Sequence, residues 1–599
     1  MTTPLTPAPD SEGPAHVSHV PAPQPALSLR QQLAAFDGVF WICIFMELME
    51  RMAYYGVRLV VPVYLVLGQS AGGPGLNHIE KGYILASWGA MQSWLPVLVG
   101  GFADRFGYKR TIFVSILLKT AGYAGMALAG DFWGMMLGTQ LLAAGTGLFK
   151  PGIQGTLAHS IAKSPGTNSM GWGLFYQSVN IGAAVSAYIP MFTRDIFGWP
   201  SVFIACSLLV CSNLIPLMFY DDPKDERQTI KDERSILRLI GESIRDLFTS
   251  PVLLGFIIIS AGFWFTFHQI FDMLPNYVDD WTDSTGFKRM IGETFGLTSW
   301  VAEADKGVNI PQERLLNLNA ILIMFTMFAF AWLSSKVQVL TSTIVGMGVA
   351  SLSVGIFLLT ANFWMVVLGI TLFTVGEMLS SPKRQEYMAS LAPPGKRALY
   401  LGYANMPDGI GWVLGSLLAG AAYEVHGDKK NLARRFLEGQ DGPAVEAAAR
   451  TFAEKAQAWP AKLQGLADDK AAALLKEAGT SIEAYRELVT NAAKALKLPE
   501  GTLPAQVLDT LAQKVALGGD GADLVAKILP REDVLAHVVQ AVPTLPGGAT
   551  NSLNALREHL FLTYDPGQIW FIFIVIGLLS TVMMVGYDRW VRSRVQRPV

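Results

Sequence analysis

Four charges near the start of the chain lie within a segment that is long and apolar enough to cross a bilayer. They are Glu47, Glu50, Arg51 and Arg58, with apolar runs on both sides. Each charge at membrane depth costs roughly 2.5 kcal/mol or more on insertion scales, so such groups usually face a wet cavity. At about 100° per residue, Glu47, Arg51, Tyr54 and Arg58 fall on one helical face. Two interpretations stay open: an ion-pair ladder that fixes this helix to its neighbours, or a helix that handles protons and substrate.

The composition restricts the class of protein. The 599 residues are 51% hydrophobic and only 16% charged, whereas soluble proteins have about 25% charged residues. This predicts an all-α, multi-pass membrane protein and not a soluble enzyme. The net charge of −2 argues against a nucleic-acid partner. The sequence has no metal-ligand spacing, nucleotide loop or nucleophile elbow, so we expect no enzymatic activity and no cofactor other than the proton.

Apolar stretches predict about twelve spans, because a hydrocarbon core of about 30 Å needs about 20 residues. They lie near 37–67, 81–103, 110–129, 132–158, 169–193, 200–220, 251–277, 317–335, 338–360, 363–390, 399–424 and 568–588. A polar loop is expected between 277 and 315. Lys and Arg concentrate after the even-numbered spans and at the end of the chain. The positive-inside rule then puts both termini in the cytoplasm, in the cell membrane or, in a Gram-negative cell, the inner membrane.

The spans divide the chain into two halves and an insertion. We expect a disordered cytoplasmic tail (1–36), a first six-helix bundle (37–220), an amphipathic cytoplasmic linker (221–250), helices seven to eleven (251–426), a helical outer insertion (427–566), helix twelve (567–590) and a short cytoplasmic tail (591–599). The insertion is rich in Ala, Leu, Glu and Lys with helical periodicity. It is either a cap that captures a protein partner or substrate, or a decoration without function.

One loop motif points to a superfamily. After the second span the chain reads Gly100-Gly101-Phe102-Ala103-Asp104-Arg105-Phe106-Gly107-Tyr108-Lys109-Arg110. This resembles the Gly-x-x-x-Asp-Arg-x-Gly-x-Lys-Arg motif of the major facilitator superfamily. The resemblance implies two six-helix bundles that rock about a central site, which agrees with the division of the spans.

Further motifs resemble the proton-dependent oligopeptide transporters of that superfamily. The matching segments are Glu47-x-x-Glu50-Arg51-x-x-Tyr54-Tyr55-Gly56, Gly145-Thr-Gly-Leu-Phe-Lys150-Pro151, Phe175-Tyr176-Gln177-Ser178-Val179-Asn180-Ile181-Gly182 and Glu377-Met-Leu-Ser-Ser381-Pro382. The resemblance covers the chain except the tail and the insertion. The chain departs from the pattern in four ways. Met52 replaces a Phe, Lys383 and Arg384 follow Pro382 where small or apolar residues are usual, no extra pair of spans separates the halves, and the insertion is unusual.

The predicted depth of the charged residues in the membrane groups them independently of the motifs. With a rise of about 1.5 Å per residue, Glu47 to Arg51 lie about 15–21 Å from the cytoplasmic face, Lys150 about 12–15 Å and Glu377 about 16–20 Å. These groups therefore share a level near the middle of the bilayer, where transporter sites form. Arg58 and Asp272 share a level nearer the outside, so Asp272 is the candidate gate partner of Arg58.

The resemblance implies roles for these residues. Glu47, Glu50, Arg51, Lys150 and Glu377 would couple transport to protons, and Arg58 would lie near the peptide carboxylate or at the outer gate. Glu377 and Asn180 would receive the peptide amino group. The complete set expected at the substrate is Arg51, Tyr54, Tyr55, Arg58, Lys150, Tyr176, Asn180, Trp264, Glu377, Ser381 and Trp412.

Simpler interpretations stay open for several of these residues. Lys150 can neutralise a neighbouring glutamate, and Tyr176 and Asn180 can bind adjacent helices together. Trp412, beside a glycine, suits packing. His268 is either a proton carrier or a hydrogen-bonded structural group.

The sequence therefore predicts a proton-coupled symporter that imports di- and tripeptides by alternating access. Its expected partners are the small peptide and the lipid bilayer. One rival interpretation keeps the proton machinery but moves another zwitterion or anion, such as nitrate or a peptide-like compound. Another is a non-transporting membrane sensor that uses the outer domain.

Overall fold

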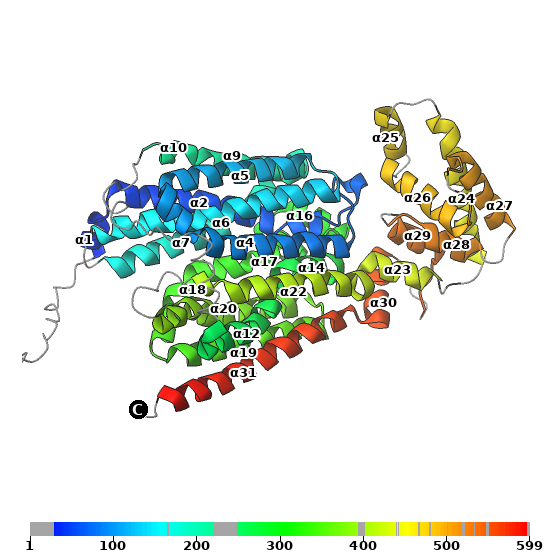
Figure 1. The fold of residues 1–599 in the computed structure, drawn as a ribbon. Coiled ribbons are helices and arrows are strands. Elements are labelled where there is room, and N and C mark those ends of the chain that lie inside the picture. Colours follow the sequence, from blue (N-terminus) through cyan, green and yellow to red (C-terminus); the bar gives the residue numbers. More distant parts are fainter. Residues whose placement is uncertain are drawn as a thin grey trace, which may run out of the picture.

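The computed structural model describes the helical elements of the chain and most of their connections. The described residues are 29–164, 167–219, 248–392, 400, 402–438, 440, 443–464, 468–477, 481–499, 501–517, 521–531, 533–546, 550 and 552–595. The described residues form helices and their connecting turns. They also contain one isolated β-bridge, between Thr544 and Thr550. The fold is that of an all-α membrane protein with two six-helix bundles (Figure 1).

The first bundle is built from the first half of the chain. Its helices are α2 (Gly38–Arg58) with α3 (Val61–Tyr64), α4 (His78–Phe106), α5 (Tyr108–Leu128), α6 (Phe132–Ala162), α7 (Asn168–Ser186) with α8 (Tyr188–Phe197), and α9 (Pro200–Ser212) with α10 (Leu214–Leu217). Asp37 and Asp131 begin α2 and α6 by accepting backbone N–H bonds from Phe40 and Gly134. The first predicted span, 37–67, is broken after Arg58, because the helix ends there and Pro62 starts a separate turn.

The second bundle follows the same plan. Its helices are α12 (Pro251–Phe267) with α13 (Gln269–Asp272) and α14 (Leu274–Trp281), α17 (Gln312–Leu316) with α18 (Leu318–Ser335), α19 (Val339–Leu359), α20 (Phe363–Leu391), α22 (Met406–Ala422) and α31 (Phe571–Val595). Helix α22 continues as one π-helical turn, η2 (Tyr423–Gly427), and η3 (Pro566–Trp570) precedes α31. The predicted twelfth span is extended, because helix α31 runs on to Val595.

Seven stretches in the described part of the chain are long and apolar enough to cross a membrane by composition alone. They are Tyr108–Leu128, Pro200–Leu217, Pro251–Asp272, Gln312–Ser335, Val339–Leu359, Phe363–Leu391 and Pro566–Ser593. Helix α2 falls outside this set although it lies in the same bundle, since it carries Glu47, Glu50, Arg51 and Arg58. Its polar groups are therefore held against protein and not against lipid.

Glycines set the close packing between neighbouring helices. A Cβ atom on Gly145 of α6 would lie 2.3 Å from Cγ of Lys119 on α5, and one on Gly376 of α20 would lie 2.6 Å from the carbonyl of Gly346 on α19. These approaches are shorter than any side chain tolerates, so small residues are required there. The glycine of the Gly145-x-Gly147 motif thus makes room for a lysine stem.

The two bundles touch along α4 and α22 and along α7 and α18. Gly82 and Gly420 bring α4 and α22 so close that a Cβ on Gly420 would lie 2.5 Å from the carbonyl of His78. From α7, the Gln177 amide donates to the carbonyl of Met324 at 3.0 Å. From the start of α18, the Asn317 amide donates to the carbonyl of Ala184 at 2.8 Å.

The insertion is a separate group of helices at one end of the bundles, opposite α1 and the C-terminal end of α31 (Figure 1). It begins after α23 (Lys429–Glu438), and its helices are α24 (Pro443–Leu463), α25 (Asp468–Glu477), α26 (Ile482–Ala495), α27 (Pro504–Ala516), α28 (Gly521–Ile528) and α29 (Val534–Ala541), after which α30 (Leu553–Tyr564) leads back to the membrane. We name this end of the molecule the outer end and the opposite end the inner end.

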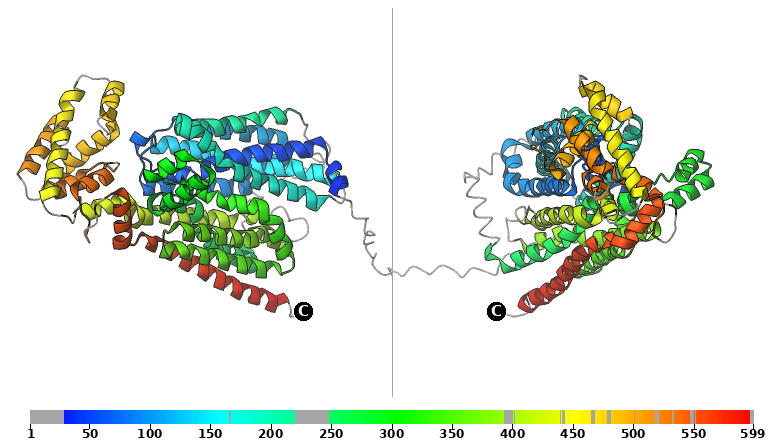
Figure 2. Two further views of the ribbon diagram at one scale, coloured as in Figure 1. Left: turned by 180° about the vertical axis from the view of Figure 1, so that it is seen from behind. Right: turned by 90° about the vertical axis from the view of Figure 1, so that its right-hand side faces the viewer.

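Three further predictions are either corrected by the structure or fall on residues that it does not describe. The loop predicted between 277 and 315 contains a pair of helices, α15 (Thr285–Phe295) and α16 (Thr298–Asp305), which projects from the side of the bundle (Figure 2). The predicted disordered tail 1–36 contains a short helix, α1 (Leu29–Ala34). Residues 1–28 of that tail and residues 221–247 of the amphipathic linker lie outside the described residues.

Candidate functional site

A fully buried charge cluster lies on the inward face of α2. The Arg51 guanidinium pairs with Glu50 and lies 3.3 Å from the Glu47 carboxylate. Lys119, from the middle of α5, pairs with the same Glu50 carboxylate, and both side chains have no exposed surface. Two acidic and two basic groups from adjacent helices therefore share one enclosed network, in which a change at one member acts on the others.

The sequence analysis did not include Lys119. The signal was present, since Lys119 is a lone lysine near the centre of an apolar span, and ionisable residues at that depth are functional candidates by default. The predicted partner Lys150 is not the group that Glu50 binds, although it lies within electrostatic range of Glu47 and Arg51. The basic group bound to Glu50 thus comes from α5 and not from α6.

Glu377 of α20 lies where the two bundles face each other. Its carboxylate accepts a hydrogen bond of 2.9 Å from the Asn319 amide of α18. The same carboxylate acts electrostatically on the hydroxyls of Tyr55 and Tyr176, which belong to the first bundle. Tyr176 keeps 41% of its surface exposed. Tyr176 is therefore a partly open side chain near the charges of the other bundle, and we name the region between Tyr55, Tyr176 and Glu377 the chamber.

A second polar group on the chamber gathers around Asp408 at the start of α22. The His268 ring nitrogen lies 3.1 Å from its carboxylate, and the Arg384 guanidinium lies 3.8 Å away. Across the bundle interface, the Ser93 hydroxyl donates to Asp408 at 3.4 Å. Lys150 of α6 lies within electrostatic range of both Asp408 and Arg384. The sequence analysis missed Asp408, because a lone aspartate after a Pro at a helix start suggests only a cap.

Arg58 and Asp272 form the centre of what we name the outer closure, together with Trp412 and Ser416. The two charges pair directly, and Arg58 also donates to the carbonyl of Phe271 at 3.1 Å. The Trp412 indole donates to Asp272 at 3.0 Å, and the Ser416 hydroxyl binds the same oxygen. All four side chains are at least 97% buried. The bundles are therefore sealed toward the outer end.

The predicted substrate residues consequently fall into two groups. Five of them keep part of their surface exposed, namely Tyr55, Lys150, Tyr176, Glu377 and Ser381. The other six are buried, namely Arg51, Tyr54, Arg58, Asn180, Trp264 and Trp412. Tyr54 packs edge-on against Tyr55 and Trp88, and Trp264 stacks under the Arg384 guanidinium at 4.1 Å. Asn180 donates to the carbonyl of Tyr176 on its own helix at 3.0 Å. In this conformation Arg58 and Trp412 belong to the outer closure and not to the chamber wall.

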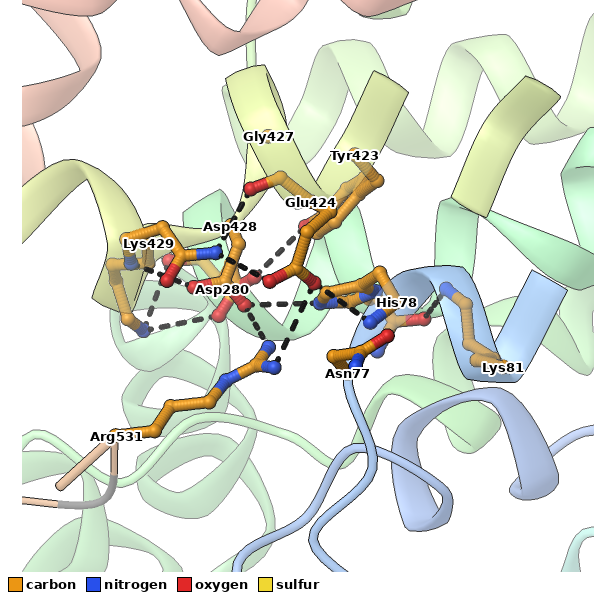
Figure 3. A network of polar contacts seen from close by, with 12 residues as sticks. Asn77, His78, Lys81, Asp280, Tyr423, Glu424, Gly427, Asp428, Lys429 and Arg531 are labelled. Atoms are coloured by element: carbon orange, nitrogen blue, oxygen red, sulfur yellow. Dashed lines mark hydrogen bonds and ion pairs between the residues drawn. The ribbon is translucent and has the colours of Figure 1, made fainter. Parts of the chain in front are cut away.

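A network at the outer end joins both bundles to the insertion (Figure 3). At the start of α4, the His78 backbone N–H donates to Glu424 at 2.7 Å, and its ring contacts Asp428 at 2.9 Å. Arg531 of the insertion pairs with Asp428, and a second guanidinium nitrogen lies 3.7 Å from Glu424. Nearby, the Lys81 ammonium donates to Asn276 at 2.7 Å. The insertion thus contacts η2, the continuation of α22, and the same two acidic residues bind the start of α4.

Within the described part of the chain, no group of three or more His, Cys, Asp or Glu side chains is arranged to hold a metal ion. Cys43, Cys206 and Cys211 are free thiols.

Two six-helix bundles that pack against each other, with charged groups of both bundles near their interface, define a multi-pass helical membrane protein. The family model described as the Major Facilitator Superfamily matches residues 40–416. The chain therefore belongs to the major facilitator superfamily.

Curated relatives within the superfamily are similar over part of the chain. Dipeptide and tripeptide permease A of Serratia proteamaculans (strain 568) is 31% identical over 182 residues, which are 30% of this chain and 34% of the relative. A di-/tripeptide transporter of Lactococcus lactis subsp. cremoris is 30% identical over 164 residues, which are 27% of this chain and 31% of the relative. The matched region thus spans about a third of each relative.

Solved structures share the fold over a longer stretch. A crystal structure of a peptide transporter POT in complex with sulfate has a TM-score of 0.53 and 19% identity, covering 66% of this chain and 94% of that chain. A POT family transporter in complex with 5-aminolevulinic acid has a TM-score of 0.53 and 16% identity, covering 64% and 91%. At this identity the likeness establishes the fold.

Proposed function

We propose that this protein is a proton-coupled symporter that imports di- and tripeptides across the cell membrane, with both termini in the cytoplasm. The observation that carries the proposal is the charge polarity of the chamber. The Glu377 carboxylate accepts a hydrogen bond from the Asn319 amide, and Lys150 lies within electrostatic range of Arg384. A small zwitterion has its two charges at opposite ends and fits this arrangement.

The aromatic walls support a broad range of peptide side chains. Tyr55 and Tyr176 combine an apolar ring with a polar hydroxyl, and both keep some exposure to the chamber. Such side chains accept apolar and polar neighbours without demanding one shape. The peptide amino group would pair with Glu377, which fixes one end while the side chains vary.

The cluster of Glu47, Glu50, Arg51 and Lys119 is the proposed proton-coupling unit. Its four charges balance only while both carboxylates are ionised, so protonation of one carboxylate frees a cation for another partner. Arg51 also lies within electrostatic range of Lys150, which connects this unit to the chamber. Substrate binding and proton binding then influence each other reciprocally, as linkage requires.

The outer closure supplies the alternating-access step. With Arg58 paired to Asp272, the chamber is shut toward the outer end, so the structure corresponds to an inward-facing or occluded state. Opening to the outside requires this pair to break, and rocking of the bundles is the motion expected of this fold. The names of the curated relatives agree with a peptide as the cargo.

Uptake of a labelled dipeptide into proteoliposomes under an imposed pH gradient tests the proposal. We expect accumulation driven by the gradient, lost in Glu50→Gln and Lys150→Ala. Lys336→Gln, at the exposed inner end of α18, is a control that should accumulate normally. Accumulation of nitrate, or of a zwitterion other than a peptide, without dipeptide uptake would show that the cargo is not a peptide. The absence of any uptake would favour a sensor.

A further inference from the structure

The α15–α16 hairpin stands out sideways from the second bundle near the outer end (Figure 2). Helix α15 ends at Gly296, which has a φ of 68°, and Leu297 leads directly into α16. The residues on both sides of this glycine are apolar, and Phe295 and Leu297 are 70% and 40% exposed. A turn that stands in water is usually built from polar residues. The tip of this hairpin therefore has a composition that does not suit water.

The two helices of the hairpin are fixed to each other. The Lys288 ammonium of α15 pairs with Glu303 of α16 at 2.6 Å and donates to the carbonyl of Val308 at 3.1 Å. A Cβ atom on Gly292 would lie 2.8 Å from a methyl carbon of Val301, so the helices are in close contact there. The exposed apolar side chains thus belong to a formed structure and not to a frayed end.

Helix α15 is amphipathic. At about 100° per residue, four apolar side chains fall on one face, namely those of Phe287, Met290, Ile291 and Phe295. The charged residues Arg289 and Glu293 fall on the opposite side, where Arg289 pairs with Asp305 of α16. A helix of this kind lies in the plane of a membrane, with its apolar face at the boundary between headgroups and acyl chains.

The hairpin contacts the second bundle at the level where a span meets the outer boundary of the membrane. The Phe287 ring stacks on that of Phe363 at 4.7 Å and meets the Trp364 ring edge-on at 5.3 Å. Helix α20 begins at Phe363, directly after the outer turn that follows Leu359 of α19. Tryptophans at the end of a span are typical of the membrane–water interface. The base of the hairpin therefore lies at that interface and not in the water beyond it.

The apolar face of the hairpin continues a surface that already faces lipid. Trp364, Leu368 and Leu372 form a row on α20 with a spacing of four residues, and all three are exposed. Because α20 spans the membrane, this row meets acyl chains, and Phe287 extends it sideways at the outer boundary. A soluble protein partner would have to enter the bilayer to cover this continuous surface, so lipid is the occupant that fits it.

We propose that the α15–α16 hairpin binds the outer leaflet of the bilayer, with Met290, Phe295 and Leu297 inserted among the acyl chains next to the headgroups. Arg289 and Glu293 stay on the aqueous side. Because the hairpin connects α14 to α17, it anchors the second bundle at the outer surface of the membrane. This inference concerns the bilayer and does not depend on the cargo.

Site-specific fluorescence in liposomes tests the anchor in the full-length protein without its three native cysteines. A single cysteine replaces Thr294, which is exposed on the apolar face of α15, and carries an environment-sensitive dye. The liposomes are made of phosphatidylcholine with a nitroxide on the upper part of the acyl chain. The emission should fall by at least about half, because the apolar face lies about 5–10 Å into the leaflet. Iodide in the water should quench this site only weakly.

Three reference sites make the result specific. Glu293→Cys is the matched control, since it is the neighbouring exposed residue on the charged side of α15, and it should respond to iodide and little to the nitroxide lipid. Val582→Cys, exposed on the membrane-spanning α31, gives full quenching by lipid. Leu517→Cys, exposed at the end of α27 in the insertion, gives none.

A second variant tests the tip directly. Phe295→Glu together with Leu297→Glu, added to Thr294→Cys, should reduce quenching by lipid at least about threefold, because charges are costly among acyl chains. Both positions are largely exposed within the hairpin, so the fold should be kept, and thermal unfolding in detergent verifies this.

The anchor is wrong if iodide quenches Thr294→Cys and Glu293→Cys equally, which would place the hairpin in water. It is also wrong if neither quencher reaches Thr294→Cys, because a protein surface such as a second copy of the chain would then cover the apolar face. Unchanged quenching by lipid after both glutamates are introduced would exclude the tip as the inserted part.

Discussion

Lys119 of α5 and Glu50 of α2 form an ion pair with no exposed surface on either side chain. The stem of Lys119 passes over Gly145 of α6, where any larger residue would collide with it. The Ser115 hydroxyl, one turn earlier on α5, donates to the carbonyl of Gly145 at 2.6 Å. Three helices of the first bundle are therefore fixed around one charge.

Replacing Lys119 by Met should destabilise the protein by about 3–5 kcal/mol, because it leaves a buried carboxylate with one partner fewer. The change is measured by thermal unfolding in detergent. Lys119→Met combined with Glu50→Gln should recover much of the loss, since the uncompensated charge is removed. A double variant no more stable than the single one would show that Lys119 acts through packing alone.

Breaking the outer closure should expose its interior to the outside. Ser416 is 1% exposed, so a Ser416→Cys variant without the three native cysteines should react slowly with a membrane-impermeant thiol reagent. Adding Arg58→Gln leaves Asp272 buried and unpaired, and labelling should then rise by more than about tenfold. Equal labelling rates in the two backgrounds would contradict a gate at this pair. Arg314→Gln, which removes a partly exposed pair with Asp195, serves as the control.

The insertion should brace the outer closure through Arg531. Burial disfavours the ionised form of Asp428, but the Arg531 guanidinium more than offsets this and holds the pKa of Asp428 below its ordinary range. The stability that comes from this pair is thus present above about pH 4 and is lost as the pH falls below it.

Arg531→Gln should therefore speed amide hydrogen exchange in η2 and α23 at neutral pH, and should raise outer labelling of Ser416→Cys. Arg450→Gln is the matched control, because Arg450 lies in the same insertion and forms only an exposed pair with Glu446. Unchanged exchange in Arg531→Gln would mean that the insertion does not support the closure.

The insertion should lose stability at mildly acid pH through His537. Burial lowers the pKa of the His537 imidazole to about 4, against about 6.5 in an unfolded chain. Between these values the unfolded state binds the extra proton, so stability rises with pH and falls on acidification. The loss at pH 5 relative to pH 7.5 is about 2 kcal/mol.

Hydrogen exchange in α24 and α29 of the full-length protein measures this loss after correction for the intrinsic effect of pH. The ring of His537 lies 5.5 Å from that of Phe452 in α24, so a His537→Leu variant keeps an apolar contact. The variant should show little pH dependence between pH 5 and 7.5. An unchanged dependence would exclude His537 as the cause.

The sequence by itself determined the class of protein. Apolar length and charge placement predicted the helices, since the bilayer imposes length and helical hydrogen bonding on every span. The same depth argument predicted that Arg58 and Asp272 share a level, and the structure brings them into contact. The contacts between helices at one depth are harder to predict. The sequence of a span gives the depth of each residue in the membrane, but not the helix against which each face packs.

Tertiary structure alone decided which charges are partners. Glu50 binds Lys119 and not Lys150, because the absence of a side chain at Gly145 of α6 leaves room for the stem of Lys119 on its way to Glu50. Asp408 joins His268 and Arg384 only through the packing of α12, α20 and α22. Long-range contacts of this kind depend on how whole helices pack, which no local pattern of residue types records.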